Sequence, residues 1–94
     1  MSPGDDQTAL GRITDEVFRA RATLAKRSVI VSGHPTSVTL EAIYWDLLRQ
    51  AADERGCSVN ALVSEIDLLR TEAQTGNLSS AIRVWLVMHQ MNTK

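Results

Sequence analysis

The stretch Thr36-Ser37-Val38-Thr39-Leu40 decides the fold of this chain, because hydroxyl and apolar side chains alternate along it. Such alternation predicts a strand with one buried face. The strand leads into an apolar-periodic segment at 41–55, and Gly56 separates that segment from a second one that opens at Ser58. A strand, a helix, a turn and a helix in about 35 residues cannot close a hydrophobic core alone. We therefore predict that the chain needs a partner, most simply a second copy of itself.

Apolar spacing predicts three helices in this part of the chain. The first, at 41–55, has a stripe of five apolar residues: Ile43, Tyr44, Leu47, Leu48 and Ala51. Gly56 follows as its C-terminal glycine cap. The second has Ser58 as its N-cap and is expected to bury Leu62, Val63, Ile66 and Leu69. A polar loop at 71–76 follows. The third helix, capped by Asn77 or Ser79 and ending near Met91, is apolar on most sides, which favours burial in a dimer body or a larger assembly.

A second alternating stretch, residues 28–32, precedes the first with the opposite parity. Val29 and Val31 occupy odd positions, whereas Val38 and Leu40 occupy even ones. In one straight strand these pairs would point to opposite faces. Gly33-His34-Pro35 can reset the register, because glycine accepts unusual dihedral angles and proline donates no ladder bond. We predict a hairpin or a sharp bulge there, with all four apolar residues on one buried face.

The N-terminal part divides into a polar start and an amphipathic segment. Residues 1–6 are expected to be disordered. Apolar residues at helical spacing then predict a helix over about 8–25: Leu10, Ile13, Val17, Phe18 and Leu24. This helix could dock on the rest of the chain, cover a partner or fold only on binding. The predicted organisation is a flexible N-terminus with a helix at 1–25 and a folded domain at 26–91.

Composition sets limits on function. The chain has 94 residues, 44% of them hydrophobic, and a net charge of −1, which suggests one folded domain without the overall basic charge usual in nucleic-acid binders. The bases are nevertheless concentrated before the first strand, at Arg19, Arg21, Lys26 and Arg27. No leader or membrane-spanning segment is evident, so a cytoplasmic location is expected.

Catalysis and metal binding find no support in the sequence. The single cysteine, Cys57, excludes a disulfide within the chain, and His34 and His89 lack a spacing that suggests a metal site. No nucleophile motif, glycine-rich phosphate loop or acid–base pair is present. We expect no enzymatic activity, no metal and no cofactor.

Three of these segments resemble a known fold family. Residues 36–40, 41–56 and Ser58-Val59-Asn60-Ala61-Leu62 are similar to the ribbon-helix-helix fold of the Arc and MetJ repressors. The longer run from Lys26-Arg27-Ser28-Val29 through Gly33-His34 to Asn77-Leu78-Ser79-Ser80-Ala81 resembles a bacterial variant with an added C-terminal helix. The resemblance covers roughly residues 26–90. It implies a mainly α fold with a short β ribbon, a homodimer or higher oligomer, and a transcriptional regulator that binds double-stranded DNA.

The resemblance also implies roles for particular residues. If the strand at 36–40 pairs across a twofold axis, Ser37 and Thr39 project outward, where the family reads base edges, although they could equally be ordinary solvent-facing residues. The helix start at Ser58, Val59 and Asn60 would clamp phosphate. The best-placed long polar side chains near the ribbon are Lys26, Arg27 and His34. The expected dimer interface consists of apolar residues: Val38, Leu40, Leu62, Val63, Ile66 and Trp85.

A rival function uses the same fold without specific DNA binding. The chain would then be a protein-interaction or assembly module, or an antitoxin-like adaptor, that binds another chain through its N-terminal or C-terminal helix. Three features favour this rival: the acidic pI near 6.1, the short outward side chains and the parity break. A second strand at 28–32 would give the dimer four strands, whereas a major groove admits two.

Overall fold

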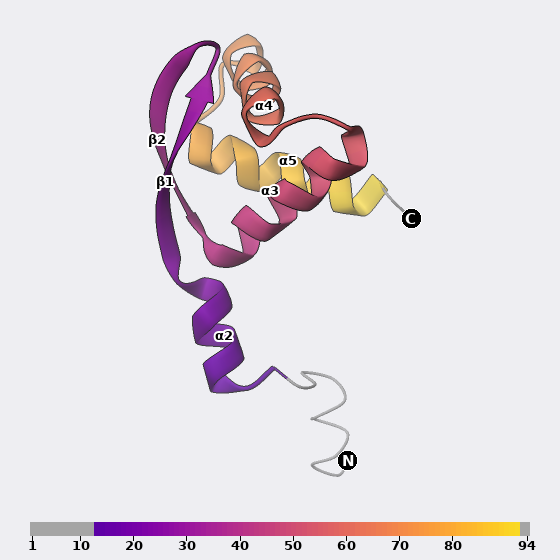
Figure 1. The fold of residues 1–94 in the computed structure, drawn as a ribbon. Coiled ribbons are helices and arrows are strands. Elements are labelled where there is room, and N and C mark those ends of the chain that lie inside the picture. The colour runs from indigo at the N-terminus through magenta and orange to yellow at the C-terminus, as the bar shows by residue number, and fades with distance from the viewer. Residues whose placement is uncertain (1–12, 93–94) are drawn as a thin grey trace.

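The computed structural model describes residues 13–92 and confirms a mainly α fold with one short β ribbon (Figure 1). Helices α3, α4 and α5 lie on one side of the two-stranded ribbon, and α2 projects from the ribbon's far end. In chain order the elements are α2 (Asp15–Ala22), β1 (Leu24–Val31), β2 (His34–Glu41), α3 (Ala42–Arg55), α4 (Val59–Ala73) and α5 (Leu78–Asn92).

The ribbon is a hairpin formed within one chain. β1 and β2 pair antiparallel in a register that runs from Val31 opposite His34 to Leu24 opposite Glu41. The connecting turn has two residues, Ser32 and Gly33, both at positive φ (49° and 85°), as the mirror-image turns of tight hairpins require. The turn therefore lies one residue earlier than predicted, and His34-Pro35 opens β2.

The hairpin resolves the parity conflict between the two alternating stretches. Residues directly opposite each other in the two strands share a face. With a two-residue turn, odd positions of β1 lie opposite even positions of β2, such as Val31 opposite His34. The predicted buried face is confirmed, because four apolar side chains of the hairpin are buried against the helices: Val29, Val31, Val38 and Leu40.

The turn yields a prediction about Gly33. A left-handed backbone costs an L-residue about 1 kcal/mol, so Gly33→Ala should lower the free energy of unfolding by about that amount, even though a Cβ there would meet nothing within 4 Å. Gly76→Ala is the matched control: its Cβ would make only ordinary contact, 3.9 Å from the Ser80 Cβ. Urea titrations of both variants measure the difference, and equal losses would contradict the positive-φ turn.

Proline protects one free edge of the ribbon. In a two-residue hairpin the pair that flanks the turn, Val31 and His34, is hydrogen-bonded. Pro35 is the next residue, so its nitrogen faces the outer edge of β2, where the missing N–H removes no ladder bond. A proline in this strand is thus compatible with the pairing and blocks strand addition at that point.

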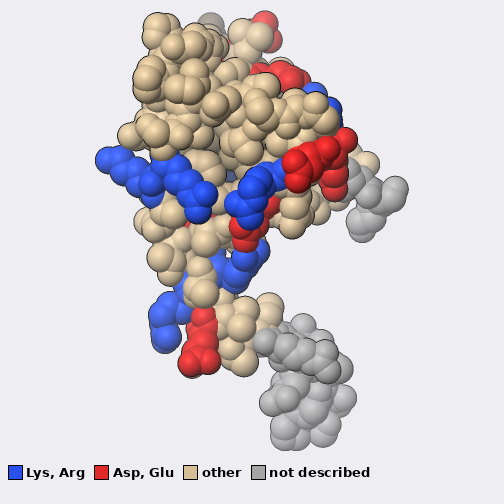
Figure 2. Space-filling model, in the orientation of Figure 1, with Lys and Arg blue, Asp and Glu red and all other residues tan. Residues whose placement is uncertain are grey.

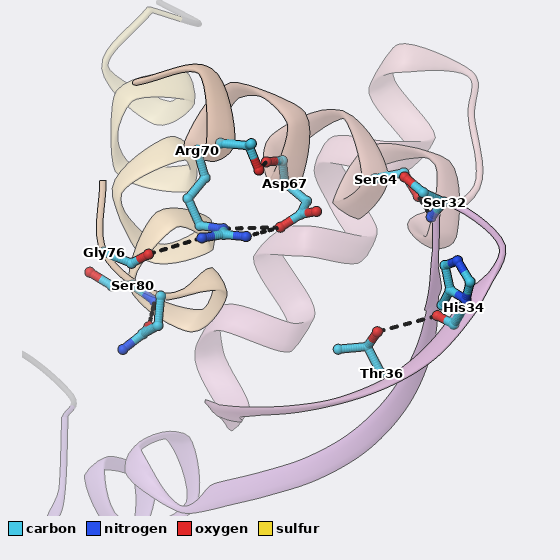
Figure 3. A network of polar contacts seen from close by, with 10 residues as sticks. Ser32, His34, Thr36, Ser64, Asp67, Arg70, Gly76 and Ser80 are labelled. Atoms are coloured by element: carbon cyan, nitrogen blue, oxygen red, sulfur yellow. Dashed lines mark hydrogen bonds and ion pairs between the residues drawn. The ribbon is translucent and has the colours of Figure 1, made fainter. Parts of the chain in front are cut away.

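Side chains of α4 protect the free edge of β1 near the turn. The Asn60 Oδ1 accepts a hydrogen bond from the Ile30 N–H at 3.0 Å. One helical turn later, the Ser64 Oγ accepts from the Ser32 N–H at 2.9 Å (Figure 3). These two bonds satisfy backbone groups that would otherwise lack a partner, and they hold α4 beside the ribbon tip.

One chain closes its own hydrophobic core. Five residues predicted to lie in a dimer interface are each at most 2% exposed within the chain: Val38, Leu40, Leu62, Val63 and Ile66. The prediction that a partner is needed to bury them is wrong. Strand β1 and helix α5 supply the missing cover, which the unit of about 35 residues considered alone does not contain. The sixth predicted interface residue, Trp85, is half-buried and stacks on His89 with ring centroids 5.0 Å apart.

The predicted helix caps are found in the structure. Gly56 ends α3 in the left-handed conformation, the Ser58 Oγ accepts from the Ala61 N–H at 3.0 Å, and the Asn77 Oδ1 accepts from the Ser80 N–H at 2.8 Å. Helix α4 continues to Ala73, so the predicted loop at 71–76 is shorter than expected. These caps are local chemistry, which explains why the sequence indicates them.

Burial on the outer helices was overpredicted. Leu69, expected in the core, is 50% exposed, because it lines an open groove between α4 and α5. Helix α5 buries only Ile82 and Leu86. Arg83, expected at a solvent edge or paired with Asp67, instead donates to the Glu41 carboxylate at 2.9 Å.

Helix α2 is shorter than predicted and lies at the molecular surface. It spans Asp15–Ala22, whereas Leu24 and Ala25, expected to end the helix, belong to β1. The predicted helical residues 8–12 and the predicted disordered residues 1–6 lie outside the described part of the chain. No residue of α2 is buried. An ion pair between Arg21 and Asp46 links α2 to α3.

The Arg21–Asp46 pair predicts a pH effect. Hydrogen bonds from Arg21 and then Arg49 lower the pKa of Asp46 below its ordinary 3.8. A carboxylate with a lowered folded pKa contributes stability above pH 3.8 that is lost as the pH falls through the lowered value. Amide exchange of α2 should therefore accelerate below about pH 4 relative to exchange in α4, after correction for the intrinsic rate. Equal protection of α2 at pH 7 and pH 3 would contradict this anchoring role.

Candidate nucleic-acid interface

The ribbon face turned away from the helices is polar. Because side chains alternate along each strand, the burial of Val38 and Leu40 directs Ser37 and Thr39 outward. Ser37 is exposed and Thr39 is half-buried. In the hairpin register Lys26 lies opposite Thr39, and Ser28 lies opposite Ser37. One ammonium group and three hydroxyls therefore share this outward face, and the exposed apolar pair of Ile30 and Pro35 follows toward the tip.

Arg27 belongs to the other face of the ribbon. It lies opposite Val38, and its guanidinium carbon stands over the Trp45 ring, 5.3 Å from the centroid. This cation–π contact holds the arginine against α3. The sequence treats Lys26 and Arg27 as equivalent candidates, whereas the register separates them and leaves Lys26 as the cation of the outward face.

His34 is exposed beside the turn. It shares the inner-face parity of Val31, its partner in the register. The His34 carbonyl oxygen accepts from the Thr36 hydroxyl at 3.2 Å, as Figure 3 shows. His34 thus lies at the tip of the ribbon and not among the outward residues Ser37 and Thr39.

The start of α4 lies next to the ribbon tip. Ser58 is exposed and caps the helix, Val59 packs partly against the core, and Asn60 is bound to β1 through the Ile30 N–H. The first-turn N–H groups of Val59 and Asn60 have no acceptor within the helix. The structure thus joins two parts of the predicted site, the ribbon and the helix start, through one side chain.

The local charge of the ribbon is positive, although the chain has a net charge of −1. Glu41 is the acidic residue of the two strands, and it is engaged by Arg83, whose hydrogen bond lowers the pKa of Glu41. Figure 2 shows Lys and Arg side chains gathered on the lower half of the ribbon and the adjoining surface. Residues 30–37 at the tip carry neither Lys, Arg, Asp nor Glu. The ribbon can therefore approach phosphate without carboxylate repulsion.

Sequence reasoning missed Ser28, Ile30 and Ser64. The first two lie on the outward face and the third fastens the tip. A two-residue turn centred on Ser32-Gly33 would have placed Ser28 opposite Ser37, so the signal was the exact position of the turn.

Within residues 13–92, no helix has both the length and the apolar content needed to cross a membrane.

Comparisons with known proteins agree with this architecture. The family model described as ribbon-helix-helix domain matches residues 24–90, which include both strands and nearly all of α3 to α5. Among solved structures, an uncharacterized protein from Bordetella pertussis Tohama I is similar, with a TM-score of 0.70 and 25% identity over 92% of this chain and 67% of that chain. No curated protein matches the sequence. Because the family match extends over well more than half of its length, the chain belongs to the ribbon-helix-helix domain family.

Proposed function

We propose that this protein is a DNA-binding transcriptional regulator that places the outward face of its ribbon in a major groove. One observation carries the proposal: a two-stranded antiparallel ribbon presents Lys26 and three hydroxyls on one face, and the carboxylate of its strands, Glu41, is paired with Arg83. A two-stranded ribbon matches the width of the major groove. The family supports the proposal as well, because ribbon-helix-helix domains generally form dimers and bind DNA.

The residues divide into positioning and reading roles. Lys26 and the N–H groups at the start of α4 would contact phosphates, which set affinity and register. Ser28, Ser37 and Thr39 would contact base edges. A hydroxyl can donate or accept, so these contacts discriminate modestly among bases. Ile30 adds an apolar surface suited to a thymine methyl group.

A homodimer would read two half-sites. Because each chain forms its own hairpin, each copy brings a complete two-stranded ribbon. Each groove would then receive one hairpin, so the dimer would not have to insert four strands into one groove. The operator is then expected to be twofold symmetric, as the protein dimer would be.

The rival function, a protein-interaction module, is favoured by a different observation. Helix α2 exposes Ile13, Val17 and Phe18 near or along its length and buries none of its residues. A single eight-residue helix is marginal in water without tertiary packing. A protein partner that covers these three side chains would explain why the helix forms.

Fluorescence anisotropy against genomic fragments at several salt concentrations tests the DNA proposal. Lys26→Ala should weaken binding to every sequence and reduce the salt slope by about 1, as loss of one phosphate contact does. Thr39→Ala should cost about 1 kcal/mol on the preferred site and little on other sites.

Arg27→Ala is the matched control for Lys26→Ala, since the two residues are adjacent and equally charged. Its guanidinium lies over Trp45, so the salt slope should change less than in Lys26→Ala. Equal effects of the two variants would contradict the assignment of faces. Binding no tighter than the micromolar level typical of non-specific complexes at moderate salt would end the regulator proposal.

A further inference from the structure

A long groove follows α5 on the side of the molecule away from the ribbon's outward face. Its volume is about 610 Å³, which lies within the roughly 300–1,000 Å³ of pockets that hold small organic ligands. The residues of α5 that line it extend from Ser80 to Asn92. At a rise of 1.5 Å per residue they span about 18 Å. This groove, which we call the α4–α5 groove, therefore has room for an extended molecule.

The walls of the α4–α5 groove are largely apolar. Helix α4 contributes Ile66 and Leu69, and α5 contributes Val84, Trp85 and Met88. Three of these side chains, Leu69, Val84 and Met88, are 50–57% exposed. A ligand with an apolar body would remove this surface from water, which is favourable in proportion to the area covered.

The charged groups of the groove have one sign. Among the described residues that line it are two arginines and a histidine, Arg55, Arg70 and His89, but no aspartate or glutamate. The carboxylates that pair with these three side chains do not belong to the lining: Glu54, Glu65 and Asp67. A cleft lined by positive groups favours an anionic ligand.

The two arginines differ in the donors that they can offer. All three nitrogens of Arg70 are engaged, two by Asp67 and one by the Gly76 carbonyl, as Figure 3 shows. Arg55 instead uses one terminal nitrogen, which donates to Glu65 at 2.8 Å. Within residues 13–92, the Nε and Nη1 groups of Arg55 make no hydrogen bond, so they can donate to a carboxylate.

Contacts with Trp85 hold Arg55 at the groove. The guanidinium carbon lies over the Trp85 ring, 5.7 Å from its centroid. His89 stacks on the same indole, with ring centroids 5.0 Å apart. Arg55 is thus oriented before a ligand binds, which lowers the entropic cost of binding.

We infer that the α4–α5 groove binds an amphipathic organic anion, a monocarboxylate with an extended apolar body. Its carboxylate accepts hydrogen bonds from Arg55, and its apolar body lies along Leu69 and Val84 toward the start of α5. The site shares no residue with the outward face of the ribbon, so the inference stands independently of DNA binding.

NMR titration of the full chain with octanoate, below its micellar concentration, tests the site. The Trp85 indole N–H and the Met88 methyl signal should shift and saturate. The Trp45 indole N–H should not move, because that ring is 5% exposed and bonded to Ala25. Octan-1-ol, which has the same chain length without the charge, should bind at least about 10-fold more weakly, as loss of a hydrogen bond between charged groups predicts.

Two pairs of variants locate the ligand. Arg55→Gln should weaken octanoate binding about 10-fold and leave octan-1-ol binding unchanged. Arg49→Gln, on the same helix but outside the groove lining, should change neither. Val84→Asp places a carboxylate in the groove and should abolish octanoate binding, whereas Val87→Asp, also exposed on α5 but outside the lining, should not.

Several results would overturn the inference. These are octanoate affinity weaker than about 1 mM, equal affinity for octanoate and octan-1-ol, and unchanged octanoate binding by Arg55→Gln or Val84→Asp. Shifts of the Trp45 signal in parallel with those of Trp85 would indicate a general detergent effect and would overturn it as well.

Discussion

Ile66→Asp is expected to abolish folding of the chain. Ile66 is 2% exposed on the inner face of α4 and packs in the single hydrophobic core. An unpaired carboxylate at that position would cost several kcal/mol, or would be protonated at a similar cost. A small domain has only about 5–15 kcal/mol of total stability. Far-UV circular dichroism and NMR amide dispersion should therefore show a largely unfolded chain at neutral pH.

Leu68→Asp is the matched control for this prediction. Leu68 lies two residues further along α4 and is 59% exposed, so the same substitution introduces the same charge without burying it. We expect this variant to keep native dispersion and to lose little stability. A folded Ile66→Asp monomer would show that the core tolerates a charge and would contradict the assignment of Ile66 to it.

The second large effect is expected at Trp45, which joins α3 to the start of β1. The ring is 5% exposed, and the Nε1–H donates to the Ala25 carbonyl at 2.9 Å. Trp45→Ala should cost about 3–5 kcal/mol, because it removes a large buried side chain and leaves a cavity. Urea denaturation gives the free energy of unfolding directly.

Trp45→Phe separates packing from hydrogen bonding. It keeps an aromatic ring but deletes the donor to Ala25, and the smaller ring also leaves a reduced cavity. The loss should be about 1–3 kcal/mol, between the wild type and Trp45→Ala. If Trp45→Ala were no more destabilising than Trp45→Phe, the buried ring would not be the anchor of β1.

The elements that local chemistry determines could be predicted from the sequence. The opposite parity of Val29 and Val38 indicated a reversal between them, and the structure places a two-residue turn there. Gly56 and Ser58 marked a helix end and a helix start, since left-handed glycine and a serine N-cap act within a few residues.

Features that depend on contacts distant in sequence could not be predicted. Leu24 fits the helical spacing of the N-terminal segment, yet it pairs with Glu41 in the ribbon. Leu69 fits the buried period of α4, but no element within residues 13–92 covers it fully, and it is 50% exposed. Periodicity indicates which side chains can face a neighbour, whereas only the tertiary arrangement decides whether a neighbour is present.

The same limit applies to the candidate site. The outward direction of Ser37 and Thr39 followed from alternation alone, and the structure agrees. The separation of Lys26 from Arg27 required the register and the position of Trp45. The predicted dimer interface consisted of residues that are in fact in the core of one chain. The prediction considered only the strand at 36–40 and the two helices after it, and so left out the cover that β1 provides.

The hairpin within one chain has a genetic consequence. Both strands of a ribbon, including the opposed pair Lys26 and Thr39, are encoded by a single polypeptide. In the proposed dimer, a mixed pair of an altered and an unaltered copy would contain one defective ribbon and one intact ribbon. A ribbon assembled from strands of two chains would instead be damaged in every mixed dimer. Substitutions on the outward face should therefore leave the ribbon of the unaltered copy intact.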